Sequence, residues 1–134
     1  MAGYSATPLP KKLGIKDGFH VSLIDAPVEV IAELKASLGK CEIAEDGKTA
    51  LDFSLLFTKS STALKKEFLR VAKNLTPAGM LWVSWPKKTS GVPTDLNENI
   101  VREIGLGAGL VDVKVCAVTD VWSGLKFVRR LKDR

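Results

Sequence analysis

Two short apolar runs that flank one amphipathic helix constrain the fold more than any other feature of the sequence. The runs are DFSLLFT (52–58) and MLWVSW (80–85), and such unbroken apolar runs are typical of strands covered on both faces. Between them, apolar residues recur at helical spacing: Leu64, Phe68, Val71, Ala72 and Leu75. The turn-forming segment TPAG (76–79) is expected to end this helix. A strand, a helix and a second strand in this order predict a parallel sheet.

The rest of the chain extends the same alternation. In chain order, the other predicted elements are the strand Phe19–Asp25, the helix Pro27–Leu38, the short strand Cys41–Ala44, a helix that starts at Thr94 or Asp95, and the strands Val111–Asp120 and Leu125–Arg130. The last two strands should form a hairpin around a turn at WSG (122–124). We therefore predict an α/β fold: a three-layer αβα, Rossmann-like arrangement whose mostly parallel, twisted sheet has five to six strands and a C-terminal antiparallel hairpin.

Size and composition favour a single globular domain over residues 1–134, with an irregular N-terminal arm at 1–12, where Pro8 and Pro10 interrupt regular structure. The chain is 46% hydrophobic and 26% charged, which argues against disorder. Its apolar runs are too short to span a membrane and no secretory leader is visible, so we expect a soluble, cytoplasmic protein without a membrane partner.

Charge and metal-ligand chemistry narrow the choice of partners. The net charge of +5 comes largely from a helix at 61–75 and a tail at 126–134. A solvated surface is the favoured interpretation, and binding to a polyanion is the alternative. Cys41 and Cys116 are expected to be separate buried thiols, and with His20 as the single histidine we predict no metal site.

Two resemblances follow from longer stretches of sequence. The block DFSLLFTKSSTALKKEFLRVAKNLTPAGMLWVSWPKK and the ending GLVDVKVCAV…SGLKFVRR resemble the middle and the C-terminal hairpin of class I methyltransferases. The segments GYSATPLPKKLGIKDG, WPKKTSG and WSGLKF resemble an uncharacterised family of small bacterial proteins, known as a domain of unknown function. That resemblance covers nearly the whole chain and implies a compact bacterial cytoplasmic protein, without an assigned activity.

The sequence departs from the methyltransferase pattern at the cofactor site. Those enzymes hold S-adenosylmethionine in a glycine-rich turn after the first strand, where backbone must approach the ligand. Here the turn is IDAPV (24–28), which has no glycine and includes a proline. Glu42 or Glu45 could supply the acidic residue that usually binds the ribose. The G-x-G-x-G at 105–109 follows a helix and is expected only to end it. We therefore expect no bound cofactor and lean against catalysis.

A candidate binding site is expected where the strands end, because ligands of open α/β sheets bind outside the carboxyl ends of the strands. The segments at that edge are 25–27, 58–60, 85–90 and 120–124. Within them, the residues chosen as ligand-binding candidates are Asp25, Trp85, Lys87, Lys88, Ser90, Asp120, Trp122 and Ser123. Tryptophans beside lysines and hydroxyls suit a nucleotide or an aromatic anion. No catalytic residues can be assigned.

Three functions compete. The favoured hypothesis is a small Rossmann-like module that binds a small ligand or a protein at this edge. The first alternative is a divergent S-adenosylmethionine-dependent methyltransferase, and the second is a basic protein associated with nucleic acid. The oligomeric state cannot be inferred from these patterns.

Overall fold

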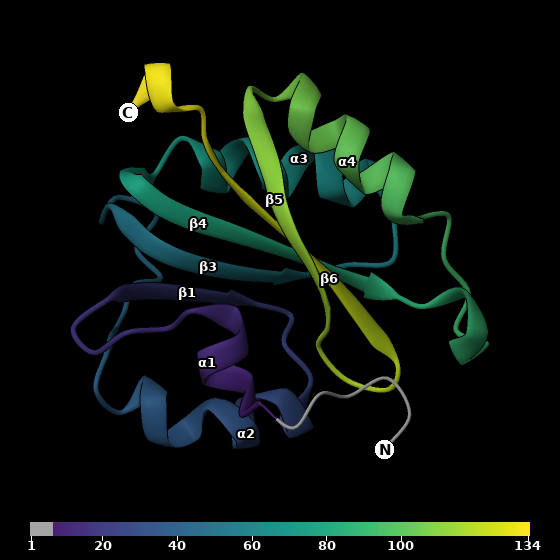
Figure 1. The fold of residues 1–134 in the computed structure, drawn as a ribbon, viewed down its shortest axis with the longest axis horizontal. Coiled ribbons are helices and arrows are strands. Elements are labelled where there is room, and N and C mark those ends of the chain that lie inside the picture. Colours follow the sequence, from purple (N-terminus) through teal and green to yellow (C-terminus); the bar gives the residue numbers. More distant parts are fainter. Residues whose placement is uncertain (1–6) are drawn as a thin grey trace.

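A single six-stranded sheet with helices on both faces organises the structure, a computed structural model that describes residues 7–134 (Figure 1). The strands are β1 (His20–Ile24), β2 (Glu42–Ile43), β3 (Leu51–Phe57), β4 (Leu75–Pro86), β5 (Leu110–Ala117) and β6 (Trp122–Arg129). The α-helices are α1 (Leu9–Leu13), α2 (Val28–Leu38), α3 (Ser61–Ala72) and α4 (Glu98–Gly107), and short 3₁₀ helices cover Lys88–Ser90 and Leu131–Asp133.

The strand order is β2-β1-β3-β4-β6-β5. The first four strands in this order run parallel, and β6 runs antiparallel to both of its neighbours, β4 and β5. The predicted fold class is therefore confirmed, including the C-terminal hairpin, whose last strand β6 lies beside β4.

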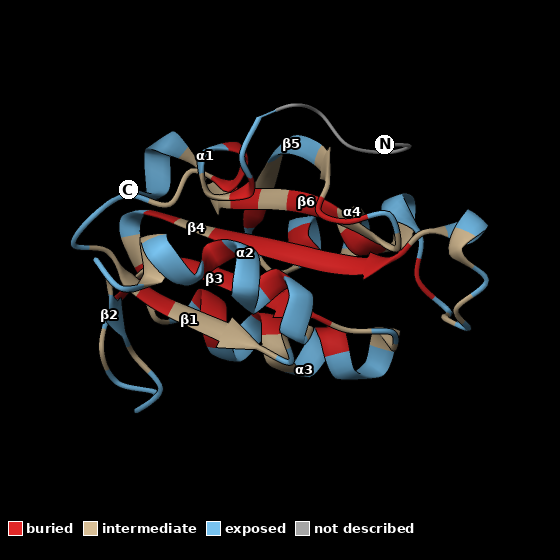
Figure 2. Cartoon of the chain, turned by 90° about the horizontal axis from the view of Figure 1, so that it is seen from below, coloured by how far each residue is buried: buried red, intermediate tan, exposed pale blue. Residues whose placement is uncertain are grey.

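The sheet separates two hydrophobic cores, because side chains of a strand alternate between its faces. Leu9 and Leu13 of α1 and Val30 and Leu34 of α2 pack on one face of the sheet. Helices α3 and α4 pack on the other face, where Phe68 meets Phe127 edge-to-face at 5.1 Å. Strand β3 and the second half of β4, from Leu81 to Pro86, are almost wholly buried (Figure 2), as their unbroken apolar runs predict.

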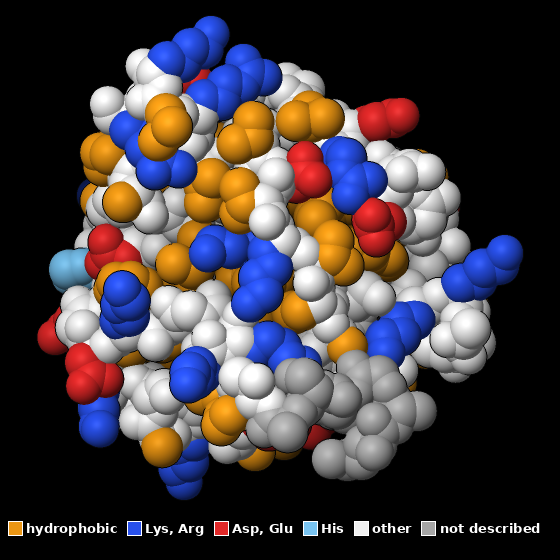
Figure 3. Space-filling view, in the orientation of Figure 1, with side chains coloured by type: hydrophobic (Ala, Val, Ile, Leu, Met, Phe, Trp, Pro, Cys, Tyr) orange, Lys and Arg blue, Asp and Glu red, His pale blue; other side chains and the backbone are white. Residues whose placement is uncertain are grey.

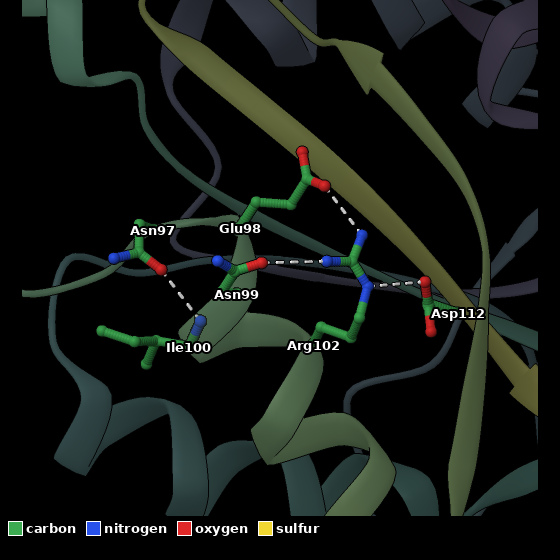
Figure 4. Close-up of polar contacts among 6 residues, drawn as sticks. All are labelled: Asn97, Glu98, Asn99, Ile100, Arg102 and Asp112. Atoms are coloured by element: carbon green, nitrogen blue, oxygen red, sulfur yellow. Dashed lines mark hydrogen bonds and ion pairs between the residues drawn. The ribbon is translucent and has the colours of Figure 1, made fainter.

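Helix α4 is tied to the edge strand β5 by one arginine (Figure 4). The Arg102 guanidinium donates to the carboxylate of Glu98 at 2.7 Å, one turn earlier in α4, and to Asp112 of β5 at 2.9 Å. The helix begins after Asn97, whose side chain accepts from the Ile100 amide at 2.9 Å. The expected start at Thr94 or Asp95 is thus early by a few residues, and the Asp95 side chain binds another helix instead.

The structure corrects the predicted N-terminal arm. Residues 1–6 lie outside the described residues, but Leu9–Leu13 form α1 directly after Pro8. A proline in the first helical turn costs little, because the amides there have no partner within the helix in any case. The two leucines of α1 that face the sheet then supply the burial that keeps so short a helix in place.

Two predicted turns are also wrong. The segment 122–124 is the first part of β6, and the hairpin turn lies just before it, where Thr119 Oγ1 accepts from the amides of Val121 and Trp122 at 3.0 Å each. The segment 76–79 belongs to β4, at a point where the register with β3 shifts.

Candidate functional site

The turn after β1 has a conformation that glycine usually adopts, but without a glycine. Asp25 has φ +55°, and among residues 7–134 it is the only non-glycine residue with a positive φ. Aspartate tolerates this left-handed region better than most residues, although it is still a strained choice. Asp25 does not cap the next helix, since Pro27 holds the cap position and no side chain caps α2.

A cavity of about 390 Å³ opens at the carboxyl ends of β1 and β3. Its lining combines an acid, a lysine, two hydroxyls and two aromatic rings: Asp25, Phe57, Thr58, Lys59, Ser60 and Trp122. The rings of Phe57 and Trp122 meet edge-to-face, with centroids 5.1 Å apart and planes at 80°, which gives the cavity a fixed aromatic wall. Asp25 and Lys59 are both exposed, so their charges are available to a ligand.

A second cavity of about 280 Å³ lies on the α3 side of β1, and Asp25 lines this one as well. Glu45, Arg70 and Asn74 contribute to its more polar lining. Of the two acids proposed to bind a ribose, Glu45 is therefore the one near the carboxyl ends of the strands. Glu42 of β2 lies opposite His20, at the amino end of β1. Asp25 stands at the junction of both cavities.

The N-terminus of α3, which follows Ser60 of the larger cavity, already holds an anion. Asp95 accepts from the Ser61 amide at 2.8 Å and from its hydroxyl at 2.9 Å, and these hydrogen bonds hold the pKa of the Asp95 carboxyl below its usual value. The Ala63 amide is bound by the Ser60 side chain. A ligand in the cavity would thus meet side chains of 58–60 rather than a free helix terminus.

The predicted site residues are only partly brought together. Asp25 and Trp122 line the same cavity. Trp85 is 4% exposed and packs in the core under α3 and α4, whereas Trp122 packs against the other core, so the predicted convergence of the two indoles is wrong. The reason is register: Pro86 lies opposite Trp122, which places Trp85 opposite Ser123 and on the other face.

The remaining candidates lie around the hairpin turn. The Lys87 amide donates to the Val121 carbonyl at 2.8 Å, which ties the loop of Lys87 and Lys88 to the turn that carries Asp120. The Ser90 hydroxyl donates to the Lys87 carbonyl and the Ser123 carbonyl accepts from Ser84, so both contacts serve the local structure. Ligand binding by any of these residues stays a prediction.

Four lining residues of the larger cavity were not predicted as site residues, although segment 58–60 was placed at this edge. One of them, Phe57, is the last residue of β3. Thr58, Lys59 and Ser60 directly follow β3 and precede α3. In a parallel sheet, residues that follow a buried strand lie at the ligand edge, and that position was the available signal. The sequence instead favoured Trp85 and Trp122 as ligand-binding residues, because tryptophans beside lysines suit an aromatic anion.

The single histidine lies at the far end of the sheet. His20 and Asp52 begin β1 and β3, and His20 Nδ1 is 3.4 Å from Asp52 Oδ2. The same carboxylate accepts from the His20 amide at 2.8 Å, and Thr76 Oγ1 lies 3.3 Å from its other oxygen. This group lies at the amino ends of β1 and β3, whereas the larger cavity lies at their carboxyl ends. Within residues 7–134 no group of metal-ligating side chains gathers.

Each of the two basic segments contains an arginine that makes structural contacts. Arg129 of the tail donates to the carbonyls of Ala72 and Leu75 at 2.8 and 2.7 Å, at the end of α3. On α3, Arg70 pairs with Glu67 at 2.6 Å. The two cysteines are free and partly buried rather than fully so, and burial raises the pKa of the Cys116 thiol.

Comparison with solved structures defines the class of fold. The chain superposes on magnesium protoporphyrin IX methyltransferase from Synechocystis with bound SAH at a TM-score of 0.61 and 12% identity, covering 90% of this chain and 78% of that one. A SAM-dependent methyltransferase from Aquifex aeolicus gives 0.56 and 17%, with coverages of 87% and 85%. The O-methyltransferase NcsB1 from neocarzinostatin biosynthesis gives 0.63 and 12%, where 96% of this chain spans about half (51%) of that one. The fold is that of class I methyltransferases.

A family model then places the chain more closely. The model described as a protein of unknown function, DUF3052, matches residues 11–131, so this chain belongs to that family. A sequence search of curated proteins found no match. No helix within residues 7–134 is long and apolar enough to cross a membrane.

Proposed function

We propose that this protein binds a small molecule in the cavity at the carboxyl ends of β1 and β3, and that it is a binding module of a methyltransferase-like fold. The observation that carries the proposal is Asp25, which keeps a left-handed backbone at the junction of two cavities. Strained residues persist where the surrounding structure and a function require them. A residue chosen for stability alone at this position would be glycine.

The lining indicates the kind of ligand. Asp25 would attract a cationic group, Lys59 an anionic group, and the Phe57–Trp122 wall a flat ring. The cavity volume of about 390 Å³ lies at the low end for ligand pockets. A zwitterion or a nucleoside of modest size satisfies these groups together, and this chemistry is compatible with a role in binding alone.

A second candidate is S-adenosylmethionine-dependent methyl transfer. The favouring observation is the likeness to structures solved with SAM or SAH, together with Glu45 and Asp25 at the ends of adjacent strands. Against it stands the turn at 24–28, where Pro27 offers no amide to a cofactor and no glycine lets the backbone approach. The cofactor would therefore have to bind through side chains.

Titrations of the protein followed by nuclear magnetic resonance test the proposal, with S-adenosylmethionine and its two component molecules as probes. S-adenosylmethionine, adenosine and methionine are titrated separately, and we expect saturable shifts of the Trp122 indole N–H and the amides of 25 and 58–60. Asp25→Asn removes the charge but tolerates the same backbone, so it should weaken binding of cationic probes by about tenfold. Glu29→Gln, an exposed acid on α2, is the matched control.

The outcomes separate the candidates. Adenosine or methionine alone binding as well as the whole cofactor supports a small-ligand module. S-adenosylmethionine and S-adenosylhomocysteine that compete for one site, and bind much more tightly than either part, support the methyltransferase reading. If none of the probes shifts these residues up to millimolar concentration, the proposed ligand chemistry is wrong.

A further inference from the structure

A cluster of lysines lies on the α1 side of the sheet, away from the cavities at the strand ends. Lys126 of β6 lies opposite Lys114 of β5 on one side and Trp82 of β4 on the other. Residues opposite each other in antiparallel strands share a face, so both lysines lie on the face that carries Trp82 and α1. Lys12 of α1 belongs to the cluster because its carbonyl accepts from Lys114 Nζ, and the charge of Lys16, just after α1, acts on Lys126. Figure 3 shows lysine and arginine side chains gathered on this side of the molecule.

Two of these ammonium groups are held by the backbone of neighbouring elements. Lys12 is only 9% exposed, and its Nζ donates to the Ala117 carbonyl of β5 at 2.8 Å. Lys114 Nζ donates to the Lys12 carbonyl at 3.1 Å. These reciprocal contacts between α1 and β5 fix the positive charges in place, unlike lysines that extend freely into solvent.

The cluster is electrostatically unfavourable by itself. Like charges directly opposite each other in adjacent strands destabilise a sheet. Burial lowers the pKa of Lys126, and the charges of Lys114 and Lys16 lower it further. Among the ion pairs formed within residues 7–134, none includes Lys16, Lys114 or Lys126. A bound anion would remove this repulsion.

We propose that the lysine cluster of Lys12, Lys16, Lys114 and Lys126 is a binding site for a phosphate-bearing anion. Several lysines on one face of the sheet match a group with more than one negative charge, for which lysine is a common partner. The cluster is compact, whereas a nucleic acid would require basic residues spread along a surface to follow its backbone. The site is independent of the ligand cavity at Asp25.

Stability measurements with inorganic pyrophosphate test this site. Pyrophosphate should raise the unfolding midpoint well beyond sodium chloride at the same ionic strength, because screening alone depends only on ionic strength. Lys126→Met keeps the side-chain stem but removes the charge. It should raise the midpoint without anion, since the repulsion is gone, and weaken pyrophosphate binding by about tenfold.

The controls make the result decisive. Lys66→Met, on the exposed face of α3, should leave the pyrophosphate response unchanged, and Lys114→Met should repeat the effect of Lys126→Met if the latter folds poorly. Sedimentation with phosphatidate vesicles distinguishes a lipid headgroup from a soluble phosphate as the source of the anion. The proposal is overturned if sodium chloride reproduces the shift, if Lys66→Met and Lys126→Met behave alike, or if neither pyrophosphate nor phosphatidate binds.

Discussion

Replacing Gly105 by alanine should destabilise the protein, although alanine is the better helix former. Gly105 lies inside α4, and a Cβ built there would be 2.0 Å from Phe127 Cε1 and 2.5 Å from its Cζ. Carbon atoms in contact normally lie about 3.5–4.0 Å apart, so the ring would have to retreat by about 1.5 Å. Phe127 is fully buried and stacks edge-to-face on Phe68, so it has no space to enter.

The magnitude follows from three contributions. Overpacking of a filled core costs about 1–3 kcal/mol, and disturbing the aromatic pair costs a further 0.5–1.5 kcal/mol, roughly. The helix propensity of alanine returns about 1 kcal/mol. The net loss is about 1–3 kcal/mol, which lowers the Tm of a domain of this size by roughly 3 to 10 °C.

Gly107 provides the matched control, because it lies in the same helix and a Cβ there meets nothing within 4 Å. Gly107→Ala should be neutral or stabilise by up to about 1 kcal/mol in urea unfolding. Adding Phe127→Leu to Gly105→Ala should recover part of the loss, and a double-mutant cycle measures that coupling. Equal stability of the two alanine variants would refute the packing argument.

Three further variants test other contacts by urea or thermal unfolding. Asp25→Gly should stabilise by about 0.5–1 kcal/mol as it relieves the left-handed strain, and no gain would mean that Asp25 is unstrained. Arg129→Met should cost about 1–3 kcal/mol because two carbonyls at the end of α3 lose their donor, whereas exposed Lys132→Met should not. Amide hydrogen bonds hold the pKa of Asp46 at about 2, so its stabilisation is present above its ordinary pKa of 3.8 and is lost as pH falls towards 2. Asp46→Asn should thus be less stable than the parent at neutral pH, and the two should converge at pH 2.

The central β-α-β unit was predictable because its determinants are local. The apolar runs and the helical stripe between them encode β3, α3 and the buried part of β4 without reference to the rest of the chain. The alternation of strands and helices and the resemblance to methyltransferases predicted a mostly parallel sheet with a C-terminal antiparallel hairpin, but not the full strand order.

The features that were mispredicted depend on contacts distant in sequence. Gly124 suggests a turn, but it lies in β6. This strand position requires glycine because Val118 and Trp82 leave no room for a side chain: an added Cβ would be 2.8 Å from Val118 Cγ2. The faces of Trp85 and Trp122 depend on a register between β4 and β6 that no local pattern specifies. A shift of one residue would have put both indoles on one face.

For the same reason, only some of the residues that line the site could be predicted from the sequence. Asp25 was chosen from its place after the first strand, but Asp-Ala-Pro before a helix favours a cap, and the left-handed backbone has no separate sequence signal. Lys59 was overlooked because a lysine after a strand is usually only solvated. Its proximity to Trp122 arises from the antiparallel strand β6, which brings residues far apart in sequence to one cavity.

The link between β2 and β3 limits what the site can hold. Parallel strands are usually joined by a crossover of a dozen or more residues that includes a helix, but here only residues 44–50 make the connection. Asp46 fixes this link by accepting from the amides of Lys48 and Thr49. Other residues of the link, Ala44, Glu45, Gly47 and Thr49, line the smaller cavity. The link thus borders the cavity of about 280 Å³, and the cavity of about 390 Å³ lies on the other side of Asp25, which lines both. Each is near the lower limit for small-molecule pockets, so we expect the ligand to be smaller than a complete nucleotide cofactor unless it spans both cavities across Asp25.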